Sequence, residues 1–243
     1  MKIYKIQWCW HGILSGNFRK ILDMSLAIYK KKRSFNRTPE PSGEKNKAGS
    51  ALHFVVQKHD ASQLHYDFRL EMNGVLKSWA IPKGPSLNPD IKRLAIMVED
   101  HPFDYRNFEG IIPEGNYGAG VVMIWDEGVY RSADINSGDI KLQEKNILQQ
   151  LHNGKLNFIL EGSKLKGEFV LVKSHGLGEN DWLFMKVKDR FASSEDITKK
   201  DKSVKSKKTL EQIATTSKNF HKSNRIAGKT KNKKSTAKQK QEK

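Results

Sequence analysis

Residues 57–70, QKHDASQLHYDFRL, carry side chains whose types and spacing suit metal and phosphate chemistry. Within residues 64–70, apolar side chains alternate with His65, Asp67 and Arg69, and a period of two is typical of a half-buried strand. A strand points these three polar side chains to one face, about 6.5–7 Å apart in succession. A helix would distribute them around its circumference. The pattern therefore predicts a strand with one apolar face and one face able to bind ligands.

His59, His65 and Asp67 form a candidate metal site. Imidazole and carboxylate are usual ligands of divalent transition metals, and three of them leave positions for water and a substrate oxygen. His59 has the parity of His65, but the turn expected at residues 60–62 leaves its direction open. Arg69 could hold a phosphate by a two-pronged, charge-assisted hydrogen bond. The competing interpretation is a solvated, charged strand face.

A second segment, residues 93–101, repeats this alternation, with Arg93, Glu99 and His101 on its polar parity. If both strands line one cavity, Arg93 and His101 join the first group around an anion. A metal triad with two arginines and a further histidine suits phosphoryl-ester hydrolysis, where positioning and charge neutralisation dominate. Alternatively, Glu99 and Arg93 form a surface cross-strand pair worth under about 1 kcal/mol.

The charge of the chain is concentrated at its C-terminal end. Residues 199–243 contain 16 Lys and Arg against 3 Asp and Glu, a net of +13, and the preceding 198 residues hold +4 of the total +17. We expect residues 193–243 to be a disordered basic tail, because they offer too little apolar surface to offset the entropy of ordering. Such a tail binds polyanions by counterion release. A solubilising tail with no dedicated partner is the alternative.

The cysteine count and the N-terminal residues bear on whether the chain has disulfides, a membrane span or a secretory signal. Cys9 is the one cysteine, which excludes an intramolecular disulfide and a multi-cysteine zinc site and suits a reducing cytoplasm. No run of about 18 apolar residues predicts a membrane span. Residues 1–23 resemble a secretory signal only poorly, and Met24 opens a stretch typical of a protein start. We expect residues 1–28 to be a disordered leader or a misassigned start.

The rest of the body predicts a mainly β fold. Residues 33–50, rich in Pro, Gly, Ser and charge, predict an irregular arm. Residues 110–120, GIIPEGNYGAG, lack the signatures of phosphate-binding and dinucleotide loops and predict a tight turn or strand bend. Residues 140–153 predict the one helix of the body, with a loop as the alternative. Further strands are expected at residues 53–58, 75–81, 121–125, 128–131, 155–160, 166–173 and 182–188.

Many short strands without βαβ alternation indicate a compact antiparallel β-barrel or sandwich with few helices and disordered termini. We expect the apolar parity to form an outer or supporting wall and the polar parity to line a pocket. Trp79, Trp125 and Trp182 each lie within an apolar strand pattern and are expected in the core rather than as stacking platforms for bases.

Taken together, these segments resemble the 3′-phosphoesterase domain of bacterial DNA ligase D and its free-standing relatives. The resemblance extends from about residue 29 to residue 190, and its strongest blocks are FVVQKHDASQLHYDFRLEMNGVLKSWAIPKGPS, KRLAIMVEDHPFDYRNFEG and IIPEGNYGAG. It implies a compact β-barrel domain over residues 29–192, with a groove that holds a divalent metal. Manganese is the first expectation, with Zn²⁺ or Co²⁺ as alternatives.

The resemblance also implies roles for individual residues. The metal ligands would be His59, His65 and Asp67. The scissile phosphate would contact Arg69, Arg93, His101 and Tyr105, with Glu99 supporting them, and His101 donating a proton to the leaving oxygen. Arg33 and Glu40 would support the site from the arm. The arm departs from the family pattern at Ser34, where the family has Asp, which is expected to alter the arm's hydrogen bonds and the balance of activities.

The implied activity is the removal of 3′-terminal ribonucleotides and 3′-phosphates from DNA or RNA–DNA ends, which leaves a 3′-OH. The resemblance places this healing in nonhomologous end joining with Ku and an ATP-dependent DNA ligase. We expect a cytoplasmic, nucleoid-associated monomer that acts on DNA ends in trans, alongside these partners. The alternatives are a non-catalytic DNA-end-binding adaptor, in which the pocket recognises a phosphate and the tail supplies affinity, and an architectural protein that uses only its tail.

Overall fold

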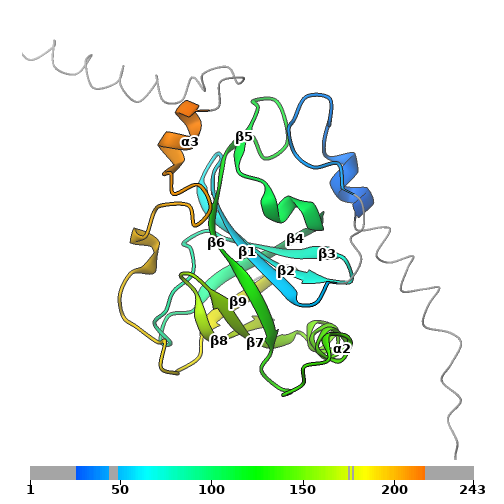
Figure 1. The fold of residues 1–243 in the computed structure, drawn as a ribbon, viewed down its shortest axis with the longest axis vertical. Helices are drawn as coiled ribbons and strands as arrows, with labels where there is room; N and C mark the ends of the chain where they lie inside the picture. Colours follow the sequence, from blue (N-terminus) through cyan, green and yellow to red (C-terminus); the bar gives the residue numbers. More distant parts are fainter. Residues whose placement is uncertain (1–25, 44–48, 175, 177, 217–243) are drawn as a thin grey trace, which may run out of the picture.

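In the computed structural model, the described part of the chain is an antiparallel barrel (Figure 1). The structure describes residues 26–43, 49–174, 176 and 178–216. The strands run in the order β1-β2-β3-β4-β9-β8-β7-β6, and a β1–β6 pairing closes this ring. A short strand, β5, pairs with β6 beside the ring. The predicted mainly β, antiparallel barrel is therefore confirmed.

The strands are β1 (Leu52–Asp60), β2 (Leu64–Met72), β3 (Val75–Ile81), β4 (Arg93–Pro102), β5 (Gly110–Ile112), β6 (Gly120–Ser132), β7 (Lys155–Gly162), β8 (Lys166–Lys173) and β9 (Asp181–Lys186). The helical elements are η1 (Phe103–Asn107), α2 (Ile140–His152), η2 (Ile197–Lys199) and α3 (Leu210–Thr216). Residues 26–31 form a further helix at the start of the described chain. In the described residues, no helix is long and apolar enough to cross a membrane.

The barrel interior is filled by aromatic and aliphatic side chains. Phe68 lies at its centre, with ring centroids 5.7 Å from Phe158 and 5.0 Å from Phe184. Trp79 and Trp125 are fully buried, and Trp182 is 3% exposed, so the tryptophans belong to the core as predicted. The expected direction of the two parities was wrong. A small closed barrel has to fill its interior with side chains, so the apolar parity faces inward and the polar parity faces outward.

A β-bulge divides β6 into two parts, which both pair with β1 but have different strands on their other side. The register between β1 and β6 shifts between Val56 and Gln57, so that Trp125 has no partner residue on β1. Before this bulge β6 pairs with β5, and after it β6 pairs with β7. Residues 121–125 and 128–131, predicted as separate strands, are therefore parts of one bent strand, because a bulge bends a strand without ending it.

The predicted helix at residues 140–153 is confirmed as α2. Asp139 caps its N-terminus by accepting hydrogen bonds from Lys141 N at 2.9 Å and Leu142 N at 3.4 Å. Its polar residues pack inward, since Gln143 Oε1 accepts from the backbone of Ser132 at 2.8 Å. Gln143 and Gln150 thus attach α2 to the barrel, since Gln150 Oε1 also accepts from the backbone of Asn157 at 2.6 Å.

A second apolar cluster lies on the outer side of the barrel. It joins the N-terminal helix and η1 to the outward face of the sheet, and its members are Tyr29, Leu76, Phe103, Tyr105, Phe108, Ile112 and Val122, with Phe35 against them. The predicted leader ended at residue 28, but its Leu26 is buried at 7% exposure, so the N-terminal helix begins within the predicted leader and is partly buried. Residues 1–25 of the predicted leader lie outside the described residues.

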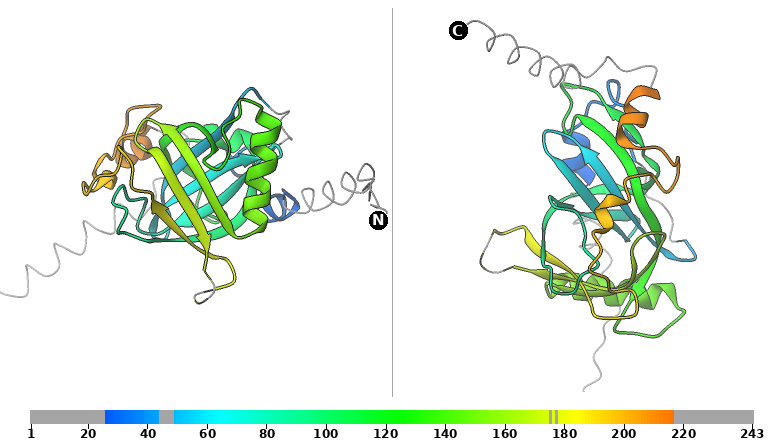
Figure 2. Two further views of the ribbon diagram at one scale, coloured as in Figure 1. Left: turned by 90° about the horizontal axis from the view of Figure 1, so that it is seen from below. Right: turned by 90° about the vertical axis from the view of Figure 1, so that its left-hand side faces the viewer.

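Residues 193–216, which were predicted to begin the disordered tail, run along the barrel and end in α3 (Figure 2). Ile197 and Ile213 are buried at 1% and 4% exposure. The backbone is also fixed, because Trp125 Nε1 donates to Lys200 O at 2.7 Å. A composition averaged over residues 193–243 conceals these few apolar residues, which join the core cluster of the barrel. Residues 217–243 of the predicted tail lie outside the described residues.

Candidate active site

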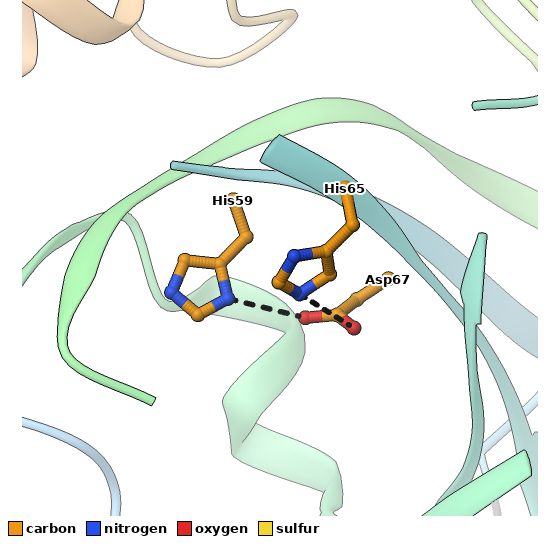
Figure 3. A group of neighbouring side chains, drawn as sticks. All are labelled: His59, His65 and Asp67. Carbon is orange, nitrogen blue, oxygen red and sulfur yellow. Dashed lines mark ion pairs between the residues drawn. The ribbon is translucent and has the colours of Figure 1, made fainter. Parts of the chain in front are cut away.

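His59, His65 and Asp67 meet on the outward face of β1 and β2 (Figure 3). The register pairs His59 directly with His65 across the two strands. One ligand atom from each of the three lies within 4.8 Å of the others. Asp67 Oδ2 is 3.7 Å from His59 Nδ1, and Asp67 Oδ1 is 3.6 Å from His65 Nε2. The direction of His59, left open by the sequence, is therefore toward the other two side chains.

Backbone carbonyls fix the proton position on both imidazoles. His59 Nε2 lies 2.9 Å from Gly118 O, and His65 Nδ1 lies 2.9 Å from Gln63 O. A carbonyl can only accept, so each of these nitrogens is the protonated one. The lone pairs of His59 Nδ1 and His65 Nε2 then point at Asp67. Metal-ligating histidines are commonly oriented in this way by their other nitrogen, so the donor set fits a divalent cation.

The loop that supplies Gly118 O is held close to the ligand strand by a glycine. Gly120, the first residue of β6, has φ +150°, and a Cβ there would collide with the backbone of Asp60. Only glycine permits this close approach. The glycine-rich segment thus forms β5 and the tight turns before β6, the first of the two predicted alternatives, and its geometry brings Gly118 to His59.

Arg69 lies beneath the triad and is 2% exposed. Its Nη2 donates to Asp67 Oδ2 at 3.0 Å, its Nε to Gln57 Oε1 at 2.7 Å and its Nη1 to Ser78 Oγ at 2.9 Å. Burial by itself raises the pKa of Asp67, but the charge of Arg69 outweighs it, so the pKa lies well below its ordinary value. Asp67 is therefore a carboxylate at neutral pH, as a metal ligand must be.

His101 lies on the outward face of β4 and is 4% exposed. Its Nδ1 is 2.9 Å from Glu99 O, and its Nε2 is 3.2 Å from Arg33 Nη2. Because the carbonyl only accepts and the guanidinium only donates, Nδ1 carries the proton and Nε2 accepts. Burial and the charges of Arg69 and Arg33 lower the pKa of His101 well below its ordinary value. His101 is thus a neutral hydrogen-bond acceptor.

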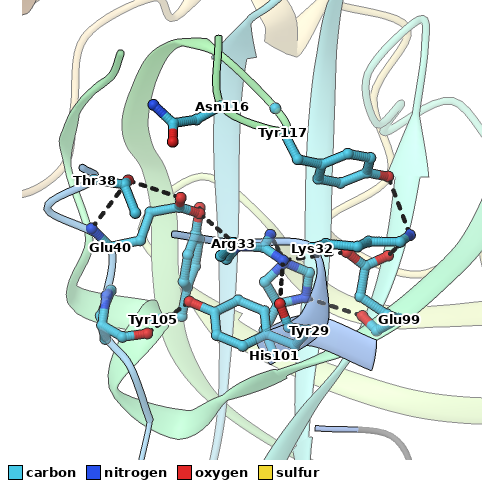
Figure 4. Close-up of polar contacts among 12 residues, drawn as sticks. Tyr29, Lys32, Arg33, Thr38, Glu40, Glu99, His101, Tyr105, Asn116 and Tyr117 are labelled. Atoms are coloured by element: carbon cyan, nitrogen blue, oxygen red, sulfur yellow. Dashed lines mark hydrogen bonds and ion pairs between the residues drawn. The ribbon is translucent and has the colours of Figure 1, made fainter. Parts of the chain in front are cut away.

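The arm, residues 26–43, inserts Arg33 and Glu40 into this group of residues (Figure 4). Arg33 Nε donates to Glu40 Oε1 at 2.9 Å, and the two side chains are 4% and 0% exposed. Glu40 also accepts from Tyr105 OH at 2.9 Å and from Thr38 Oγ1 at 2.8 Å. The two arm residues named from the sequence thus lie beside His101 and Tyr105, and the arm forms one wall of the site.

The outer rim of the site contains Lys32 and Tyr117, which the sequence did not identify as site residues. Lys32 Nζ lies 3.1 Å from Glu99 Oε2 and 3.3 Å from Tyr117 OH. Glu99 also lies 3.4 Å from Arg33. Gln57 and Ser78, which bind Arg69, were missed as well. Gln57 shares the parity of His59, and this was the signal that could have identified it.

Arg93 does not join the site, although it has the sequence parity of His101. The β3–β4 register shifts between Leu76 and Ser78, which pair with His101 and Val98 respectively. Arg93 lies before this bulge and pairs with core residue Phe184, so it lies on the face of β4 opposite to His101. Its charge helps to lower the pKa of Asp196, after the hydrogen bonds from Thr198. The bulge changes the parity of β4, and alternation alone cannot reveal it.

The domain is thus an antiparallel barrel with a candidate His–His–Asp metal site on its outer wall. Residues 57–173 match the family described as the DNA Ligase D 3'-phosphoesterase domain. The chain is 47% identical over 192 residues to the multifunctional non-homologous end joining protein LigD of Pseudomonas aeruginosa, which covers 76% of this chain and 22% of that protein. The chain belongs to the DNA ligase D 3′-phosphoesterase family.

Relatives from mycobacteria are also much longer than the part that this chain matches. The chain is 39% identical over 166 residues to the multifunctional non-homologous end joining DNA repair protein LigD of Mycobacterium tuberculosis, with 68% of this chain and 20% of that protein covered. The corresponding protein of Mycolicibacterium smegmatis is 37% identical over 171 residues, with 68% and 21% covered. The chain thus spans about one fifth of the length of the curated relatives it matches.

Proposed function

We propose that this protein is a metal-dependent phosphoesterase that heals DNA 3′ ends, removing 3′-terminal ribonucleotides and 3′-phosphates to leave a 3′-OH. The observation that carries this proposal is the triad of His59, His65 and Asp67, in which backbone carbonyls direct both imidazole lone pairs to the carboxylate. Membership of the 3′-phosphoesterase family supports the reaction class.

His59, His65 and Asp67 would hold the metal, with Mn²⁺ as our choice and Zn²⁺ or Co²⁺ as alternatives. A divalent ion bound there would withdraw charge from a phosphate oxygen as a Lewis acid. Two neutral imidazoles and one carboxylate leave a bound divalent ion with net positive charge, which favours an anionic substrate. The remaining ligand positions suit a phosphate oxygen and water.

The other residues supply charge and position. Arg69 and Arg33 place two guanidinium groups around His101, as their shared effect on its pKa indicates, and two fixed cations favour a phosphate. His101 was expected to donate a proton to the leaving oxygen. Because its pKa is lowered and its one lone pair, at Nε2, accepts from Arg33, we propose instead that neutral His101 holds the Arg33 guanidinium in position beside the phosphate. Tyr105 and Glu40 would hold this arrangement in place.

The relatives carry end joining in their printed names. We propose the same setting here, with DNA or RNA–DNA 3′ ends as substrate and with Ku and an ATP-dependent DNA ligase as partners in trans. The lysine-rich C-terminal part of the chain would add affinity for nucleic acid, which should weaken as the salt concentration rises.

A primer-template with a 3′-phosphate tests the proposal. With Mn²⁺, the wild-type protein should convert the end to a 3′-OH that a DNA polymerase extends. His65→Ala should slow this by about 100-fold or more, since even the outer partners of metal ligands contribute about 10- to 100-fold. Binding of the end without conversion by the wild-type protein would instead identify the non-catalytic adaptor.

A further inference from the structure

Tyr117 is an aromatic side chain that remains exposed beside the metal triad. It is 51% exposed, and the other large hydrophobic side chains that are exposed in the described residues are aliphatic: Ile28, Leu64 and Leu142. It lies in the turns between β5 and β6, which are closed by hydrogen bonds from Asn116 N to Pro113 O at 3.3 Å and from Ala119 N to Asn116 O at 3.2 Å. These turns fix the backbone that presents the ring.

The backbone next to Tyr117 touches a metal ligand. Gly118 O accepts the hydrogen bond from His59 Nε2 at 2.9 Å. A Cβ added at Gly118 would lie 3.8 Å from His59 Cε1. The ring is therefore attached one residue away from a direct contact with the triad.

The ring also faces the cationic arm (Figure 4). Lys32 Nζ is 4.6 Å from the centroid of the Tyr117 ring and 3.3 Å from its hydroxyl. The Arg33 guanidinium, which also contacts His101, lies 5.7 Å from the same centroid. Tyr117 thus contacts the arm through its ring, is adjacent in sequence to Gly118 at the triad, and has half of its surface open to solvent.

We propose that Tyr117 is a stacking platform for the nucleobase of the 3′-terminal nucleotide, an inference that rests on the proposed function. The base of a terminal nucleotide is joined through one sugar to the 3′-phosphate, so a ring beside the phosphate site lies where that base can reach it. Aromatic rings bind bases of every type, because each base has a π-face. Such a platform lets the enzyme hold a frayed 3′ end of any sequence.

A purely structural role would use the hydroxyl instead of the ring. In that case Tyr117 would only anchor Lys32, and through it the arm. Tyr117→Phe removes the hydroxyl and keeps the ring, whereas Tyr117→Ala removes both. The two variants therefore separate stacking from anchoring.

The test compares kinetics on two 3′-phosphate ends, one with a terminal base and one with an abasic terminal sugar. Tyr117→Ala should raise KM for the end with a base by about tenfold or more and leave KM for the abasic end nearly unchanged, and Tyr117→Phe should restore the wild-type KM. Leu142→Ala, which shortens an exposed side chain on α2, is the matched control and should change neither. Equal losses in the Phe and Ala variants, or equal losses on both ends, would overturn the proposal.

Binding gives a readout that does not need turnover. A 2-aminopurine placed at the 3′ terminus loses fluorescence when it stacks, so the wild-type protein should quench it more than Tyr117→Ala does. Equal quenching by the two proteins would overturn the stacking proposal. If the wild-type protein converts neither end, the proposed function fails, and the fluorescence still decides whether Tyr117 binds the base.

Discussion

Arg33 Nη2 donates to His101 Nε2 across 3.2 Å, which joins the N-terminal arm to the outer face of β4. The two residues are 68 positions apart in the sequence. The contact sets the proton position on the imidazole and places a second cation beside Arg69. The site is therefore completed only when the arm is docked on the barrel.

The pairing of Arg33 with Glu40 should hold the arm in place. Their charged groups are almost fully buried and 2.9 Å apart. Removing one partner would leave the other charge buried and uncompensated, which destabilises the folded state. A double-mutant cycle with Arg33→Ala and Glu40→Ala should give a coupling of about 1–3 kcal/mol in the free energy of unfolding, measured by urea denaturation. Additive effects of the two substitutions would show that the pair does not hold the arm.

The lowered pKa of His101 should make stability depend on pH. Between the folded pKa and the ordinary value near 6.5, the unfolded chain binds a proton at this residue and the folded chain does not. Stability should therefore fall as the pH decreases below about 6.5, by at most about 1.4 kcal/mol per pH unit from this one group. His101→Gln should reduce this slope when urea unfolding is compared at pH 7.5 and pH 5.5 without added metal. An identical slope in both proteins would contradict the prediction.

The segment around α3 should contribute to the stability of the barrel. Ile213 is 4% exposed, and truncating a buried isoleucine to alanine costs about 2–5 kcal/mol. Ile213→Ala should therefore lower the free energy of unfolding by at least about 2 kcal/mol. Leu142→Ala, a similar truncation at a residue that is 47% exposed, should cost much less. Equal effects of the two substitutions would mean that α3 is not packed as described.

The sequence placed site residues correctly on strands whose apolar and polar side chains alternate without interruption. It misplaced a residue on a strand where a bulge interrupts this alternation. The alternating residues 64–70 identified β2 and the common face of His65, Asp67 and Arg69, because every residue of that strand pairs in register. His59 lies on the other side of the turn that separates β1 from β2, and only the β1–β2 register shows that it opposes His65. Arg93 was misplaced because a bulge between Leu76 and Ser78 reverses the parity of β4.

The sequence also could not predict contacts between residues that are far apart along the chain. The arm was predicted to support the site, but the partners of Arg33 could not be named, since Glu99 and His101 come from a strand more than 60 residues later. The polar contacts of Arg69 with Gln57 and Ser78 arise from strand pairing on both sides of β2. Composition alone also concealed the packing of residues 193–216, because lysines outnumber the few apolar residues that anchor them.

Metal binding to the triad should stabilise the fold. A ligand that binds only the folded state at 100 times its Kd adds about 2.7 kcal/mol to the free energy of unfolding. Mn²⁺ should therefore raise the Tm of metal-depleted wild-type protein and have little effect on His65→Ala. Equal shifts in Tm for the two proteins would place the Mn²⁺ elsewhere on the chain.

The most direct measurement is the fate of a primer that ends in a single 3′-ribonucleotide, incubated with metal-depleted protein before and after Mn²⁺ is added. The wild-type protein should remove the ribonucleotide only after Mn²⁺ is added, and Asp67→Ala should leave the primer intact under both conditions. Removal of the ribonucleotide without metal, or by Asp67→Ala at the wild-type rate, would contradict a reaction that depends on the metal held by His59, His65 and Asp67.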